Sequence, residues 1–242
     1  MSASDTKLPV SGGAEKRAYV RGMFTAIAPR YDLLNHLISL NLDKAWRRRT
    51  IRLLGWERAP GGTYLDLCAG TLDLAVALAN RPGFEGTVIG ADFVLPMLQL
   101  GRHKSPRVVP LNGDALMLPF PDDSFDGATV GFGVRNLADL SQGFRETARV
   151  LKPGARFAVL ELTTPPRQPF RGLYLLYFQH LLPRIGRAVS KHTNAYSWLP
   201  ESVRVFPEPD ALAALMESSG FERVSYDLLF GGACAVHVGT KP

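Results

Sequence analysis

Three residues along the chain could together bind a nucleoside. Gly70 follows a short buried-strand candidate at residues 64–68, and a glycine lets the backbone approach a ligand closely. Asp92 comes roughly 20 residues later, at the end of a second predicted strand, where a carboxylate can accept hydrogen bonds from two ribose hydroxyls. Asp114 ends a third predicted strand and can accept from an exocyclic amine of adenine. The ordered set predicts a nucleoside site, whereas each residue alone could be a turn glycine or a strand-end carboxylate.

The loop at residues 68–73 narrows the choice of nucleoside. Enzymes that bind NAD use the pattern G-x-G-x-x-G and hold a pyrophosphate at the following helix N-terminus. This loop reads Cys-Ala-Gly-Thr-Leu-Asp, which lacks that pattern and brings Asp73 to where a pyrophosphate would lie. S-adenosylmethionine carries no phosphate, and its sulfonium and ammonium groups tolerate carboxylates. The loop therefore favours S-adenosylmethionine over NAD.

Alternating aliphatic and helical segments must position these residues. We expect strands at 64–68, 87–91, 108–111, 127–131, 156–161, 224–229 and 234–238, and helices at 73–80, 96–101, 136–151 and 210–218, with a turn at 152–154. Strands that alternate with helices in this order predict an α/β fold with a doubly wound, parallel sheet. Ligands bind such sheets at the carboxyl ends of the strands. Residues at those ends, expected to bind the cofactor, are Asp66, Gly70, Thr71, Asp92, Asp114, Ala115 and Gly131.

We expect one domain with four parts. Residues 1–60 form an N-terminal helical lid, residues 61–162 the cofactor-binding core, residues 163–206 an irregular insertion that caps the substrate, and residues 207–242 a final helix and strands. A composition of 46% hydrophobic and 21% charged residues excludes disorder as the main state.

Several other classes of protein do not fit the sequence. No apolar run approaches the roughly 20 residues of a membrane-spanning helix. Two distant cysteines and five scattered histidines exclude a disulfide framework and predict no metal site. Residues 1–16 lack the apolar stretch of a signal peptide, so we expect a cytoplasmic protein.

Basic residues are distributed unevenly. Residues 1–60 hold 11 Lys and Arg against 5 Asp and Glu, and residues 162–200 contain no carboxylate. These segments could face phosphates, an anionic membrane surface or only water.

Sequence motifs extend over nearly the whole chain. The most selective are Tyr-Asp-Leu-Leu-Asn at residues 31–35, Phe-Gly-Val-Arg-Asn at 132–136 and Leu-Pro-Arg-Ile-Gly at 182–186. Leu-Pro-Phe-Pro-Asp at 118–122 and Leu-Lys-Pro-Gly at 151–154 accompany them. With these motifs the chain resembles the ubiquinone/menaquinone biosynthesis C-methyltransferase family. It differs from that family at Leu72, where the family has glycine, and at Gly131, where it usually has serine.

The resemblance implies a class I, S-adenosylmethionine-dependent methyltransferase whose sheet is mostly parallel with a late antiparallel strand. The implied reaction methylates a ring carbon of a polyprenyl quinol, either a demethylmenaquinol or a 2-methoxy-6-polyprenyl-benzoquinol. The family's cofactor positions fall on Thr71, Asp92, Asp114 and Ala115.

Arg135 and Asn136 are the candidate catalytic residues, because a guanidinium beside a phenol oxygen stabilises the phenolate and this pair follows the fourth strand. Tyr31 and Asp32 are candidate substrate contacts.

Three alternative functions remain open from the sequence. The chain could be a natural-product O- or C-methyltransferase on the same scaffold, a non-catalytic assembly subunit, or a nucleic-acid methyltransferase. The last is disfavoured because the Asn/Asp-Pro-Pro-aromatic motif is missing, so we expect no nucleic-acid partner. The expected partners are the quinol, an anionic membrane surface visited peripherally, and either a second copy of the chain or a quinone-biosynthesis complex.

Overall fold

A seven-stranded sheet organises the protein, and the computed structural model describes residues 8–178 and 194–242. The strand order is β3-β2-β1-β4-β5-β7-β6. Strands β1 to β5 are parallel, and β7 runs antiparallel to both of its neighbours. The strands are β1 (Thr63–Leu67), β2 (Thr87–Asp92), β3 (Val108–Asn112), β4 (Phe125–Gly131), β5 (Leu151–Leu162), β6 (Glu222–Leu229) and β7 (Cys234–Thr240). This arrangement confirms the predicted α/β fold and its late antiparallel strand.

Helices cover both faces of the sheet because the strands are apolar on both sides. One face packs against α3 (Asp43–Leu54), α4 (Asp73–Ala79) and α5 (Leu95–Gly101), and the other against α6 (Leu140–Val150) and α10 (Pro209–Ser218). Fully buried side chains such as Tyr64 on the first face and Phe157 on the second make the two cores.

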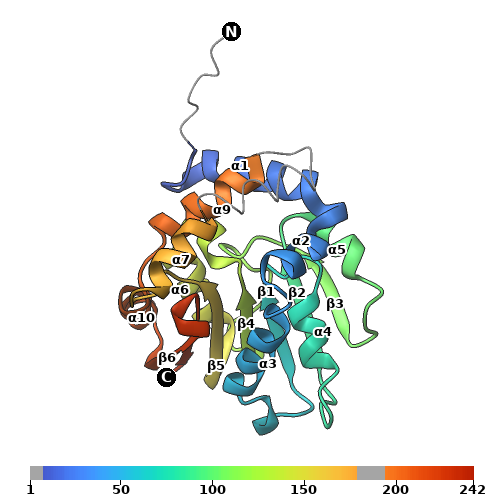
Figure 1. Ribbon diagram of the computed structural model, residues 1–242. Coiled ribbons are helices and arrows are strands. Elements are labelled where there is room, and N and C mark those ends of the chain that lie inside the picture. The colour runs from blue at the N-terminus through green and yellow to red at the C-terminus, as the bar shows by residue number, and fades with distance from the viewer. Residues whose placement is uncertain (1–7, 179–193) are drawn as a thin grey trace.

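Further helices lie across the carboxyl ends of the parallel strands (Figure 1). They are α1 (Gly13–Ile27), α2 (Tyr31–Ile38), α7 (Phe170–Leu176) and α9 (Asn194–Val205). Helix α1 packs against α9 and α5, and its Val20 and Met23 are buried with Trp198 of α9. The candidate ligand-binding edge of the sheet therefore lies under a helical cover.

Three local predictions were wrong. Helix α6 begins at Leu140 rather than at Asn136, because Asp139 caps it by accepting a hydrogen bond from the Gln142 N–H at 2.8 Å. Residues 152–154 do not separate helix from strand as a turn: they lie inside β5, where the register with β4 shifts. The insertion at 163–206 is not irregular throughout, since it contains α7 and α9.

Part of the basic, acid-free stretch lies outside the described residues, together with the Leu-Pro-Arg-Ile-Gly motif at 182–186. Within residues 8–178 and 194–242, no helix is both long and apolar enough to cross a membrane.

Candidate active site

Asp92 holds the loop that follows β1. Its Oδ2 accepts a hydrogen bond from the Gly70 N–H at 2.8 Å, and its Oδ1 accepts from the Val94 N–H at 2.8 Å. The carboxyl group is buried, and burial raises its pKa although the backbone N–H groups act in the opposite direction. Asp92 lines two adjacent cavities at this edge of the sheet, so its remaining lone pairs are available to a hydroxyl-bearing ligand.

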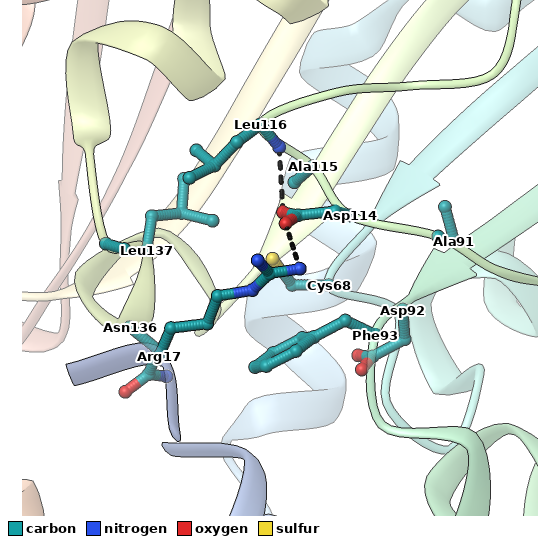
Figure 2. Close-up of a pocket in the computed structure, with 12 residues that line it drawn as sticks. Arg17, Cys68, Ala91, Asp92, Phe93, Asp114, Ala115, Leu116, Asn136 and Leu137 are labelled. Carbon is teal, nitrogen blue, oxygen red and sulfur yellow. Dashed lines mark hydrogen bonds and ion pairs between the residues drawn. The ribbon is translucent and has the colours of Figure 1, made fainter. Parts of the chain in front are cut away.

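The first cavity lies beside Asp114 and has a volume of about 20 Å³ (Figure 2). Asp114 Oδ1 accepts from the Leu116 N–H at 3.0 Å, and Oδ2 pairs with Arg17 of α1 at 2.6 Å. Phe93 and Leu137 supply apolar walls. A flat heterocycle with an exocyclic amine suits this combination of apolar walls and one carboxylate.

The second cavity, of about 40 Å³, is lined by Gly70, Asp92, Gly131 and Asn136 from the ends of the strands. Val20 and Phe24 of α1 close it from the other side, together with Tyr31. Both cavities are far smaller than the roughly 300–1,000 Å³ of common ligand sites. Helix α1 is the element that narrows them.

Leu72 is no obstacle to a ligand in these cavities. Its backbone is left-handed, with φ of 69°, a conformation that favours glycine. Its side chain is fully buried and packs against Gly90 and Gly101, where an added Cβ would lie 2.3 Å and 3.0 Å from the Leu72 side chain. The leucine therefore fills the layer between β2 and α5 and points away from the cavities.

Some of the predicted site residues line neither of these two cavities, among them Asp66, Thr71 and Asp32. Asp66 accepts hydrogen bonds from the Ala75 N–H at 3.0 Å and the Thr129 hydroxyl at 2.8 Å. Burial raises the pKa of Asp66 to about 7. The Thr71 hydroxyl donates to Asp32, which also pairs with Lys104. These contacts stabilise the loop that follows β1.

A third cavity is larger and mostly apolar, with a volume of about 240 Å³. Aromatic and aliphatic side chains from four regions of the chain form its walls: Trp46, Phe132, Phe170, Leu173, Phe178 and Phe230. Its polar lining consists of Asn35, Ser39, Asp43, Arg135, Tyr174 and Tyr177. Such a space suits a flat apolar ring with a few polar substituents.

Arg135 and Asn136 serve different cavities. Arg135 lines the apolar cavity, with its Nη1 2.6 Å from Glu161 Oε1 and 2.6 Å from the Phe132 carbonyl oxygen. Asn136 lines the two narrow cavities, and its side-chain oxygen accepts from the Trp198 indole N–H at 2.8 Å. Phe132 lines both the apolar cavity and the second narrow cavity, so it forms the wall between them.

Sequence reasoning missed three residues at this site. Arg17 closes the first cavity, Phe132 separates two cavities, and Tyr174 lines the third. Phe132 carried a signal, because it begins the Phe-Gly-Val-Arg-Asn motif that follows the fourth strand. Nothing in the pattern around Arg17 distinguishes it from a surface arginine.

Metal chemistry finds no support at this edge of the sheet. In the described part of the chain, no group of three or more His, Cys, Asp and Glu side chains could hold a metal ion.

The chain is similar in sequence to known proteins over nearly its whole length. The model of the ubiE/COQ5 methyltransferase family matches residues 13–241. A demethylmenaquinone methyltransferase of Thermus thermophilus is 49% identical over 225 residues, covering 91% of this chain and 100% of that protein. One of Deinococcus radiodurans is 44% identical and covers 98% of this chain and 99% of its own length.

Solved structures share the fold at much lower identity. A SAM-dependent methyltransferase from Thermotoga maritima has a TM-score of 0.65 at 20% identity, covering 92% of this chain and 100% of its own. Another from Aquifex aeolicus has a TM-score of 0.55 at 19% identity, covering 75% and 83%. The fold is that of the class I methyltransferases.

Proposed function

Because the chain belongs to the ubiE/COQ5 methyltransferase family, and so is a SAM-dependent methyltransferase, we propose that it methylates a ring carbon of a polyprenyl quinol. Demethylmenaquinol is our preferred substrate, since relatives at 49% and 44% identity are demethylmenaquinone methyltransferases. The observation that carries the proposal is the apolar cavity with one guanidinium in its wall, which shares Phe132 with the cavity of Asp92.

The residues at the strand ends fit S-adenosyl-L-methionine. We propose that Asp92 accepts from the ribose hydroxyls and Asp114 from the adenine amine, with Ala115 against the ring. Gly70 and Gly131 leave space for the methionine part, while Asp66 and Thr71 hold the loop. When bound, S-adenosyl-L-methionine supplies an electrophilic methyl carbon.

The two cavities beside Asp92 are too small for the cofactor, so α1 has to move outward when the cofactor binds. Arg17, Val20 and Phe24 occupy that side of the two cavities. We propose that residues 1–60 act as a lid over the core of residues 61–162, and that residues 163–206 cap the acceptor. Tyr31 lines the second cavity and would contact the ligands there, with Asp32 positioning Thr71.

In the apolar cavity, the role of Arg135 is to stabilise negative charge on a ring oxygen. The quinol O–H gives up its proton, and a ring carbon beside that oxygen gains nucleophilicity. The electron pair of this carbon forms the new C–C bond, and the electrons of the broken S–C bond stay on sulfur. Loss of the ring C–H proton then restores the aromatic ring, and the oxygen regains a proton, so one proton is released overall. Arg135 stays protonated and acts by its charge, while Asn136 on the cofactor side fixes the turn that carries it.

Access from a membrane is a further part of the proposal, because a polyprenyl tail resides in lipid. Leu40, Leu173 and Phe230 line the apolar cavity and are all more than half exposed. Leu176, which lies on α7 with Leu173, is exposed as well. Apolar side chains around a cavity mouth, with Arg167 three residues before α7, suit the surface of an anionic bilayer. Co-sedimentation with anionic and neutral vesicles tests this, and equally weak binding to both would remove the membrane from the proposal.

One experiment tests the reaction. The protein is incubated with S-adenosyl-L-methionine and, in separate samples, reduced demethylmenaquinone and reduced 2-methoxy-6-prenyl-benzoquinone, and the added methyl group is located by mass spectrometry. We expect a C-methylated naphthoquinol. Methylation of the benzoquinol would assign the ubiquinone route as well. An O-methylated product, or no product despite cofactor binding, would overturn the proposal.

A further inference from the structure

Two buried hydrogen-bonding groups at the apolar cavity have no partner. The Tyr174 hydroxyl and the Arg135 Nε are both shielded from solvent, and no described residue gives either one a hydrogen bond. The Tyr174 and Arg135 side chains are each about nine-tenths buried, and both line the same cavity. Buried polar groups in folded proteins are nearly always paired. Two such exceptions in one cavity indicate a ligand with an oxygen to accept from them.

The other polar side chains of the cavity are already paired. Tyr177 donates its hydroxyl to the Ile38 carbonyl oxygen at 3.0 Å. Ser39 donates to Asp43 at 2.8 Å, and Asp43 also accepts from Arg47 at 2.6 Å. The contrast is sharpest between the two tyrosines of one helical segment, since Tyr177 is satisfied and Tyr174 is not.

Electrostatics relate Tyr174 to the Arg135–Glu161 pair. Burial raises the pKa of Tyr174 above its usual value, with Glu161 acting in the same direction and the Arg135 cation in the opposite one. The hydroxyl therefore keeps its proton and remains a donor at neutral pH. Arg135 Nη1 is occupied by Glu161 and the Phe132 carbonyl, whereas its Nε–H has no partner among the described residues.

We propose that the Tyr174 hydroxyl, together with the Arg135 Nε–H, donates a hydrogen bond to the ring oxygen of the quinol on which negative charge develops. Tyr174 is then a catalytic residue of the reaction proposed above, on which this inference rests. Two donors fixed before the substrate arrives stabilise a phenolate more than a neutral phenol, because the charged acceptor forms the stronger bonds. The positions of the two donors also select which of the two quinol oxygens is ionised, and so which ring carbon becomes the nucleophile.

Tyr174→Phe and Tyr64→Phe form a matched pair that tests the inference. Tyr174→Phe removes an unpaired hydroxyl, so the melting temperature should stay the same or rise, while single-turnover methyl transfer falls roughly 10²-fold. Tyr64 is buried outside the site, and its hydroxyl donates to the Trp56 and Ala59 carbonyl oxygens. Tyr64→Phe therefore removes a paired hydroxyl, so the melting temperature should fall by about 2–4 °C with the rate within twofold of wild type. A tyrosine with only a packing role would give Tyr174→Phe a normal rate.

A spectroscopic measurement tests the same two hydrogen-bond donors in the absence of methyl transfer. The probe is 4-nitro-1-naphthol, whose phenolate absorbs at longer wavelength than the phenol. We expect the wild-type protein and Tyr64→Phe to lower the pKa of the bound probe, and Tyr174→Phe to lower it less. An equal probe pKa in all three proteins would overturn the inference.

The outcomes separate this inference from the proposed function. Absence of methyl transfer in the wild-type protein would refute the function and leave the probe measurement to decide whether the donors bind a phenolate. Normal methyl transfer by Tyr174→Phe would refute the role of Tyr174 and leave the function intact.

Discussion

The buried carboxyl group of Asp66 should make the stability of this protein fall as the pH rises through the acidic range. Asp66 is 1% exposed, and burial raises its pKa from 3.8 to about 7, against the smaller opposing effects of Thr129 and the Ala75 N–H. In the unfolded chain the group ionises near 3.8, whereas in the folded protein it keeps its proton until about 7. Between these two values the folded state binds one more proton, so the free energy of unfolding decreases with pH.

The interval from 3.8 to about 7 sets the size of the effect. It corresponds to about 4 kcal/mol of stability, fully present below pH 3.8 and lost by about pH 7. Asp66→Asn keeps the shape and both hydrogen-bond positions, because the amide oxygen can accept from the Ala75 N–H and the amide nitrogen can donate to the Thr129 oxygen. Asp66→Asn has no ionisable side chain at position 66.

Urea unfolding of Asp66→Asn and the wild type at pH 4, 5, 6, 7 and 8 measures the difference directly. We expect the variant to gain up to about 4 kcal/mol relative to the wild type from pH 4 to pH 8. Thr50→Val is the matched control, since it removes a buried hydroxyl that donates to the Trp46 carbonyl oxygen and changes no ionisable group, so its curve should run parallel to the wild type. A difference between Asp66→Asn and the wild type that does not change with pH would refute the reasoning.

Substitutions at four further positions test the site. Asp92→Asn should raise the calorimetric Kd for S-adenosyl-L-methionine about 10–100-fold, because a charged acceptor is lost; an unchanged Kd would remove Asp92 from the site. Arg17→Ala should lower that Kd by up to about fivefold, since a partly exposed ion pair with Asp114 is worth about 0–1 kcal/mol, and weaker binding would instead mean that Arg17 contacts the cofactor. Leu72→Gly should lower the unfolding free energy by about 1–4 kcal/mol, because the lost buried side chain outweighs the relieved left-handed backbone, with cofactor affinity unchanged; a lower affinity would contradict the outward orientation of Leu72. Arg135→Ala should reduce single-turnover methyl transfer roughly 10²–10³-fold with unchanged cofactor affinity, and Arg135→Lys should recover part of the loss; normal turnover by Arg135→Ala would refute its role.

Sequence reasoning predicted the positions that depend on strand order. Gly70, Asp92 and Asp114 follow three consecutive parallel strands, and the carboxyl ends of such strands meet at one edge of the sheet. That rule needs no knowledge of side-chain packing, so the sequence alone could bring the three residues together. The hydrogen bond from the Gly70 N–H to Asp92 and the cavity that Asp92 and Asp114 both line confirm that the three are close.

Positions that depend on local backbone conformation were harder to predict. Leu72 occupies a position that suits glycine, and the sequence could not show that its side chain turns toward Gly90 and Gly101 rather than toward a ligand. The helix expected from Asn136 begins at Leu140 because Leu137 and Asp139 are extended and the Asp139 side chain accepts from the Gln142 N–H. The contact of Arg17 with Asp114 depends on how α1 crosses the sheet, which no local pattern encodes.

Because α6 begins only at Leu140, the short segment before it lines both kinds of cavity. Residues Val134–Asn136 form a single 3-10 turn, in which successive side chains point about 120° apart. Val134 is buried in the core, Arg135 lines the apolar cavity, and Asn136 lines the narrow cavities. Because Val134 anchors the turn, Arg135 and Asn136 cannot move independently of each other. A shift of this turn would displace the proposed phenolate donor and the wall of the cofactor site together, so their alignment depends on the packing of one valine rather than on two separate loops.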